Sequence, residues 1–293
     1  MHPKNYFFVT ILACASIITL PSCMGKKQLK KEAVEPVSAQ EKPVGEEHPA
    51  HNKKIENLTY DEALKVYAYY KKLGKKQQLG QTIQRILALS TDHDLIDTLL
   101  IELADIEFEF EHYPKAEEFY AQHAQLYPGG SRLDYVMKQT IEASFKQLLE
   151  PHRDQTKTKD TIRVATKFLS IFPAENQYSE RVAYILQTCY MNLIEHELNQ
   201  VVFYLNRYTL TQQQKTLDAA WQRLMFLNRE IVPYSTNPAI KKAGELITEA
   251  QQQEQPKKDR ASIEKLIGPL QKAIKKKYRD ETPASKLNFL NRF

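Results

Sequence analysis

A large residue followed directly by proline ends three apolar-periodic segments of this chain. The three dipeptides are Tyr127-Pro128, Phe172-Pro173 and Val232-Pro233. Proline lacks the N–H that a helix interior needs and biases the preceding residue toward extended geometry, so each dipeptide marks the end of a helix. A recurrent helix end of this kind predicts an array of helix pairs. The prolines lie further apart than the roughly 34 residues of an ideal tetratricopeptide (TPR) repeat, so we expect elongated helices or loop insertions.

The clearest helix pair lies within residues 151–207. One helix closes at Phe172-Pro173, and a longer helix without proline or glycine runs from about Tyr178 to Tyr208. Five residues of the long helix share one face of a 3.6-residue period and are expected to be buried: Val182, Ile185, Leu186, Cys189 and Leu193. Only eight glycines occur in 293 residues. We therefore expect an all-α, TPR-like helical-repeat solenoid of about five helix pairs.

Three Ser or Thr residues suggest where helices begin. Thr59, followed by Glu62, matches a capping box that opens the folded part. Ser131 with Asp134 resembles a second capping box, and Thr211 with Gln214 a third. We expect each of these pairs to satisfy backbone N–H groups in the first turn of a helix.

The first 22 residues are expected to be a lipoprotein signal peptide. Lys4 precedes an apolar run from Tyr6 to Leu20, and Leu-Pro-Ser-Cys then resembles a bacterial lipobox with Cys23 as the lipidated residue. An uncleaved N-terminal anchor is the alternative. Position 24 is Met rather than the Asp that usually retains lipoproteins in the inner membrane. We expect a periplasm-facing protein anchored in the outer membrane.

Residues 23–57 are expected to be a flexible linker, residues 58–250 the TPR-like domain, and residues 251–293 a basic amphipathic helix or tail. The linker is rich in Pro, Lys and Glu and has an end-to-end distance of about 30 Å as a random coil. The basic segment suits a terminal helix that covers the last repeat, or contact with anionic lipid or with a partner.

No arrangement of residues in the sequence indicates catalysis. His196-Glu197 lacks the second His of a metalloprotease motif because position 200 is Gln. No Gly-x-Ser-x-Gly elbow or phosphate-binding glycine loop occurs, and the remaining histidines lack ligand spacing. We expect a binding protein rather than an enzyme, with no metal and no cofactor beyond the covalent lipid on Cys23. The net charge of +5 is modest and does not indicate a nucleic-acid partner.

An ordered set of motifs resembles one protein family. LDYVM at 133–137, RDQTKT at 153–158 and QYSERV with LIEHELNQVVFYLNR between 177 and 207 resemble the TPR lipoprotein subunit of the outer-membrane β-barrel assembly machinery, the BamD family. The resemblance covers roughly residues 60–246. Two departures are the absence of a Tyr-Pro closing the second helix, and extra residues at 208–213.

The resemblance implies a scaffold that promotes folding and insertion of outer-membrane proteins. Its N-terminal repeats would bind unfolded β-barrel substrates, and Tyr67 and Tyr70 are the expected groove residues. Its C-terminal repeats would bind the POTRA region of the central barrel subunit, alongside accessory lipoproteins. The expected partner-binding residues are Arg153, Asp154, Glu195, Arg207 and Arg223. The alternative is an envelope TPR lipoprotein that coordinates peptidoglycan enzymes or acts as a holdase.

Overall fold

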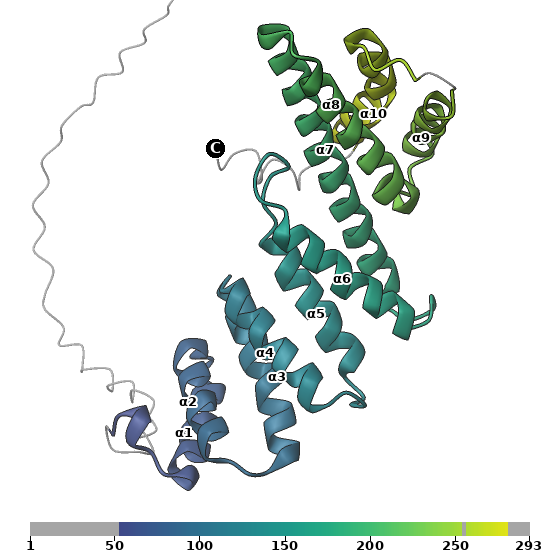
Figure 1. Ribbon diagram of the computed structural model, residues 1–293. Coiled ribbons are helices and arrows are strands. Elements are labelled where there is room, and N and C mark those ends of the chain that lie inside the picture. Colours follow the sequence, from purple (N-terminus) through teal and green to yellow (C-terminus); the bar gives the residue numbers. More distant parts are fainter. Residues whose placement is uncertain (1–52, 254–255, 281–293) are drawn as a thin grey trace, which may run out of the picture. The chain divides into compact units, whose positions relative to one another are not determined.

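The computed structural model describes residues 53–253 and 256–280 (Figure 1). The predicted signal peptide, Cys23, most of the predicted linker and the end of the predicted basic tail therefore lie outside the described residues. The regular secondary structure of the described part is entirely helical and contains no strand. Its α-helices are α1 (Tyr60–Leu73), α2 (Lys76–Leu89), α3 (His93–Glu109), α4 (Tyr113–Leu126), α5 (Leu133–Lys146), α6 (Thr156–Ile171), α7 (Ser179–Thr211), α8 (Gln214–Glu230), α9 (Pro238–Gln251) and α10 (Arg260–Asp280). Two short 3-10 helices are η1 (Ile55–Asn57) and η2 (Val232–Tyr234).

Each α-helix packs against the next one in sequence, so the described helices form five consecutive pairs, from α1/α2 to α9/α10. The helices α5 and α7, and the helices α7 and α10, are also in contact. The chain is thus an all-α, TPR-like helical repeat, as the recurrent proline-marked helix ends predict. Pro128 and Pro173 follow the ends of α4 and α6, and Pro233 lies in η2 directly after α8.

Local sequence signals explain how α1 begins and ends. The Thr59 hydroxyl accepts a hydrogen bond from the Glu62 N–H, and the Glu62 carboxylate accepts one from the Thr59 N–H. This confirms the first capping box. Gly74 ends the helix in the left-handed region, at φ 65°, where the lack of a Cβ avoids strain.

The other two predicted caps are wrong. Helix α5 begins at Leu133 without a side-chain cap, because Asp134 instead accepts hydrogen bonds from Asn176 Nδ2 and the Tyr135 N–H. Helix α7 continues through Thr211, whose hydroxyl donates back to the Arg207 carbonyl. In both cases a tertiary or within-helix hydrogen bond replaces the expected capping contact.

Helix α7 connects two hydrophobic core clusters. Its N-terminal half places Val182, Ile185 and Cys189 in a cluster with Phe168 of α6. Its C-terminal half contributes to the cluster formed with α8, α9 and α10 through Leu193, Ile194, Leu198, Val201 and Leu205. The predicted buried face of this helix is confirmed, with Leu186 partly rather than fully buried.

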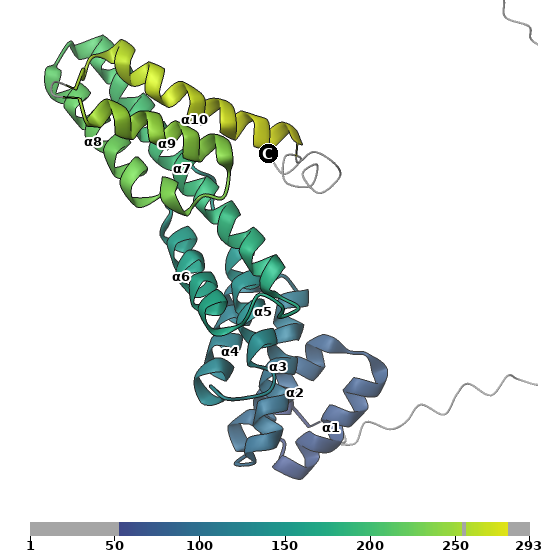
Figure 2. The ribbon, with the colours of Figure 1, turned by 90° about the vertical axis from the view of Figure 1, so that its right-hand side faces the viewer.

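Helix α10 lies alongside α9 (Figure 2). Its apolar face is buried in the same cluster as α7, α8 and α9, through Ile263, Ile267, Leu270, Ala273 and Ile274. None of the helices in the described ranges combines the length and apolar character that crossing a membrane requires. All described core clusters lie within the compact unit Glu47–Phe293. Because this unit contains its own hydrophobic core, we expect it to fold without the preceding residues.

Candidate docking surface

The loop between α5 and α6 is held in one conformation by hydrogen bonds to its own backbone. Gln155 is 4% exposed, and its Nε2 donates to the carbonyls of Glu150 and Arg153 at 2.9 and 3.0 Å. The Arg153 N–H in turn donates to the Glu150 carbonyl. The buried Gln155 side chain thus pairs with two backbone carbonyl groups. Any loop conformation that broke these hydrogen bonds would leave buried polar groups unpaired and cost free energy, so the bonds fix the backbone of the loop.

Helix α7 fixes the same loop from outside. His196 Nδ1 donates to the Pro151 carbonyl at 2.7 Å. One turn earlier, Asn192 Nδ2 donates to the Leu149 carbonyl and to Gln155 Oε1 at 3.1 and 3.0 Å. Hence the middle of α7 supports the loop that carries Arg153 and Asp154, two of the predicted partner-binding residues.

Arg153 and Asp154 lie exposed on this loop. The Arg153 guanidinium has no hydrogen-bond or ion-pair partner within residues 53–253 and 256–276. Asp154 accepts one hydrogen bond, from the Thr156 hydroxyl. Because the backbone of the loop is fixed by these hydrogen bonds, it fixes the two positions from which a cationic and an anionic side chain extend into solvent.

Beyond the loop, the same side of α7 is uncovered. His196, Phe203, Arg207 and Leu210 follow at helical spacings of seven, eleven and fourteen residues, which place them on one face. Phe203 is 53% exposed and Leu210 86% exposed, and Arg207 between them is exposed as well. We call Phe203, Arg207 and Leu210 the α7 face. Together with Arg153 and Asp154 it forms a surface of apolar side chains bordered by charges.

Two other predicted partner-binding residues lie away from this surface. Arg223 of α8 pairs with Glu197, whose carboxylate is buried, at 3.3 Å. Glu195 and Glu197 are two positions apart on α7, which separates them by about 200° around the helix. Glu195 and Arg223 therefore lie on opposite flanks of α7, with the α7 face between them. The loop with Arg153 and Asp154 meets α7 at Asn192 and His196, and Arg207 lies on the His196 side of α7, about 16 Å further along the helix axis. Glu195 and Arg223 lie on other sides of α7.

The predicted groove tyrosines lie on α1, where both are half-buried against the N-terminal core cluster. The Tyr67 hydroxyl donates to Glu102 Oε2 of α3 at 2.6 Å, and burial together with this carboxylate raises the pKa of Tyr67. Burial also raises the pKa of Tyr70, whose ring centroid lies 5.5 Å from that of Tyr69. The Tyr67 hydroxyl is thus part of an internal contact.

An ion pair between α5 and α7 was not predicted from the sequence. Arg181 donates to both carboxylate oxygens of Glu142, at 2.7 and 2.9 Å. The same guanidinium lies 5.3 Å from the Tyr184 ring centroid and 5.8 Å from that of Phe145. Burial raises the pKa of Glu142, but the Arg181 hydrogen bonds outweigh it, so that the pKa lies below its usual range. The one sequence signal near this ion pair is the spacing of Arg181 and Tyr184, which lie three residues apart on the same helix and can therefore contact each other.

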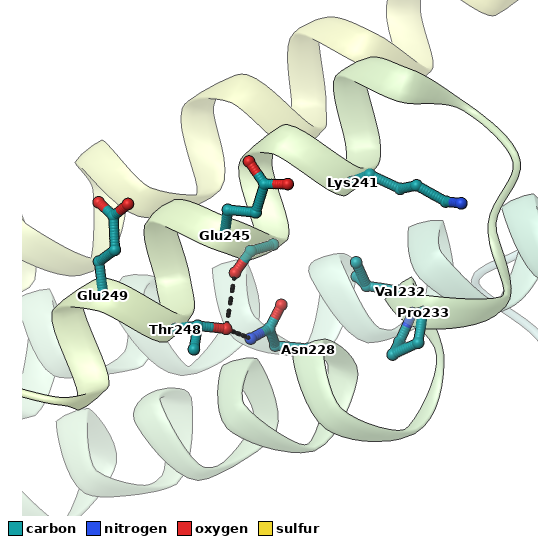
Figure 3. A pocket seen from close by; sticks show the side chains of 8 residues that line it. Asn228, Val232, Pro233, Lys241, Glu245, Thr248 and Glu249 are labelled. Atoms are coloured by element: carbon teal, nitrogen blue, oxygen red, sulfur yellow. Dashed lines mark hydrogen bonds between the residues drawn. The ribbon is translucent and has the colours of Figure 1, made fainter.

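A shallow cleft of about 510 Å³ lies between the end of α8, η2 and α9. Asn228 Nδ2 donates to the Thr248 hydroxyl at 2.9 Å, and that hydroxyl donates to the Gly244 carbonyl at 3.0 Å (Figure 3). Figure 3 shows the Glu245 and Glu249 carboxylates pointing away from this contact. The polar groups inside the cleft thus bond to one another, and we assign it a packing role.

The described residues contain no cluster of three or more His, Cys, Asp or Glu side chains placed to hold a metal ion. Comparison of the chain with models of known protein families and with curated proteins gave no match.

Proposed function

We propose that this chain is a lipid-anchored scaffold of the outer-membrane protein assembly complex, facing the periplasm. In this proposal Cys23 carries the lipid, and the α7 face with Arg153 and Asp154 binds the POTRA region of the central barrel subunit. The motif resemblance suggests the partner. The observation that carries the proposal is the uncovered α7 face beside a loop that the same helix holds in place.

The composition of this surface suits a protein partner. Binding energy at protein interfaces concentrates in a few aromatic and arginine residues surrounded by weaker contacts. Phe203 and Arg207 supply these residue types, and Leu210 adds apolar area that is otherwise exposed to water. The preformed loop reduces the entropy lost on binding, because its backbone is already ordered. Glu195 and Arg223 are then flanking positions rather than the centre of the interface.

The proposal also places unfolded β-barrel substrates against the N-terminal repeats. The rings of Tyr67 and Tyr70 would offer half-buried apolar edges to an extended chain. The Tyr67 hydroxyl remains bonded to Glu102 in this arrangement, so that recognition depends on the rings rather than on this hydroxyl.

The test is purification of full-length protein from detergent-solubilised envelopes, followed by a salt wash and identification of what remains bound. A salt wash weakens exposed charge contacts more than packed contacts. We expect the wild type to retain a large barrel protein with POTRA domains. The double variant Phe203→Asp, Arg207→Glu should lose it. The matched control is Phe110→Asp with Arg163→Glu, which alters an exposed aromatic and an exposed arginine elsewhere and should retain it.

Three results would overturn parts of the proposal. Retention of the barrel protein by the Phe203/Arg207 variant would show that the α7 face is not the interface. Loss with Arg223→Glu alone, in a protein that remains folded, would move the interface to the α8 side of α7. Recovery of peptidoglycan enzymes without any barrel protein would instead support the alternative function.

A further inference from the structure

The exposed side of α10 carries a stripe of lysines opposite its buried face. Lys265, Lys272 and Lys276 are seven and eleven residues apart, so they share one side of the helix. The buried residues Ile267 and Ile274 lie about 180° away. Because the apolar side of α10 is fixed in the core, the lysine stripe has a fixed direction, and it spans about 16 Å along the helix axis.

The described side chains do not neutralise these lysines. None of the three has an ion-pair or hydrogen-bond partner among the residues that the structure describes. The one acidic side chain described within α10, Glu264, pairs with Arg260 at 2.7 Å. Elsewhere many basic side chains are paired, as Lys71 is with Glu102 and Lys157 with Glu117. The stripe is therefore a local excess of positive charge.

The stripe differs in kind from the α7 face. Between the lysines the helix presents Gly268 and Pro269, both partly buried, and no large exposed apolar residue. A protein partner would find no apolar anchor there. A broad anionic surface needs no anchor, because diffuse phosphate charges attract each lysine separately.

We propose that the lysine stripe of α10 binds the phosphate groups of an anionic lipid bilayer. The apolar side of α10 is occupied by the core, so the contact is electrostatic and the helix does not insert. In the proposed function, the lipid on Cys23 keeps the protein at the surface of a bilayer. This last step rests on the anchor in the proposed function, whereas the charge argument does not.

The contact orients the protein on the membrane. Arg260, at the start of α10, bonds to Thr209 of α7. Thr209 lies about 120° around α7 from Phe203, so α10 meets α7 on a different side from the α7 face. A bilayer on α10 and a protein partner on the α7 face can then be bound together.

The experiment measures co-sedimentation of residues 47–293 with lipid vesicles, after circular dichroism has shown that each variant is helical. Each lysine near an anionic surface strengthens binding by about fivefold. We expect binding to vesicles with about 30% phosphatidylglycerol that falls with added salt, and little binding to pure phosphatidylcholine. Lys265→Glu, Lys272→Glu and Lys276→Glu together should weaken it by at least about 100-fold.

The matched control reverses three exposed lysines elsewhere, Lys65, Lys159 and Lys167, and makes the same change in net charge. It should weaken binding by no more than about threefold. Equal loss in both triple variants would overturn the proposal, since net charge alone would then explain binding. Equal binding to neutral vesicles, or stripe-dependent binding to nucleic acid without binding to vesicles, would also overturn it. The vesicle experiment contains no barrel protein. Its result can therefore refute membrane binding by α10 without bearing on the proposed function, and the envelope purification can refute the proposed function without bearing on α10.

Discussion

His196 Nδ1 donates a hydrogen bond of 2.7 Å to the carbonyl of Pro151, a residue 45 positions earlier in the chain. This contact joins α7 to the loop that presents Arg153 and Asp154. The contact gives His196 a structural role, because its ring supports the α5–α6 loop. The loop conformation is therefore a property of α7 as much as of the loop.

Replacing His196 with Ala should loosen this loop. The Pro151 carbonyl loses its donor, while the core clusters are unchanged, so we expect faster exchange with little change in melting temperature. Hydrogen exchange measured by mass spectrometry should rise by roughly tenfold for residues 150–155. The matched variant Asn199→Ala removes an exposed polar side chain near the same face of α7 and should not change it. Unchanged exchange in the His196 variant would mean that Gln155 and Asn192 suffice to fix the loop.

Replacing Gly244 with Ala should destabilise the C-terminal repeat. An added Cβ would lie 2.6 Å from Val232 Cγ1 and 2.8 Å from Asn228 Oδ1, so that α9 must move away from η2. We expect a loss of about 1–3 kcal/mol in the free energy of unfolding. Gly268→Ala in α10 is the control, because nothing lies within 4 Å of its Cβ and the helix gains about 0.5–1 kcal/mol from alanine. Denaturant titration of both variants compares their free energies of unfolding. Equal values for the two variants would contradict the predicted steric clash at Gly244.

The Glu142–Arg181 pair should make stability depend on pH. The pKa of Glu142 is lowered in the folded protein, so its contribution is fully present above the unfolded pKa of about 4.3 and is lost as pH falls through the folded pKa. Glu142→Gln should cost about 1–3 kcal/mol at neutral pH. It should also flatten this part of the acid-side stability curve. Glu118→Gln, at an exposed position on α4, is the control. If the free energy of unfolding changed with pH equally steeply in the wild type and in the Glu142→Gln variant, the Glu142–Arg181 pair would not be a source of the pH dependence.

Replacing Tyr67 with Phe tests whether its hydroxyl has a structural role. The hydroxyl bond to Glu102 joins α1 to α3, so its loss should lower the free energy of unfolding by about 0.5–1.5 kcal/mol. Binding of unfolded barrel substrate should be retained, because the ring is preserved. Chemical denaturation and a pull-down with urea-unfolded barrel protein measure the two effects. Loss of substrate binding without loss of stability would assign the hydroxyl to recognition instead.

Local signals predicted much of the fold. Proline and glycine mark helix ends through backbone sterics, and the apolar period of α7 identifies its buried face, so both were available from the sequence. The caps at Ser131 and Thr211 were mispredicted because Asp134 bonds to Asn176 and Thr211 bonds within α7. Such competing partners are visible only once the helices are packed.

The candidate surface was predictable only in part. Arg153, Asp154 and Arg207 are expected on the partner side by resemblance. The structure shows the first two on the loop that Asn192 and His196 contact, and Arg207 on the His196 side of α7. The exposure of Phe203 and Leu210 was not predicted, because apolar residues in a long helix are more often buried. The angular separation of Glu195 from Arg223 depends on how α8 packs against α7, which residue spacing within one helix does not reveal.

The unbroken course of α7 sets a limit on which length changes the chain can tolerate. Its 33 residues contain both the side chains that hold the loop and, further along, Phe203 and Leu210. Deleting one residue between Asn192 and Phe203 would rotate everything after it by about 100° and shift it by about 1.5 Å. The distal half would then turn a different side toward α8 and move the α7 face out of line with the loop. Homologous chains should therefore vary in length at the α7–α8 turn and keep the length of α7 between these positions constant.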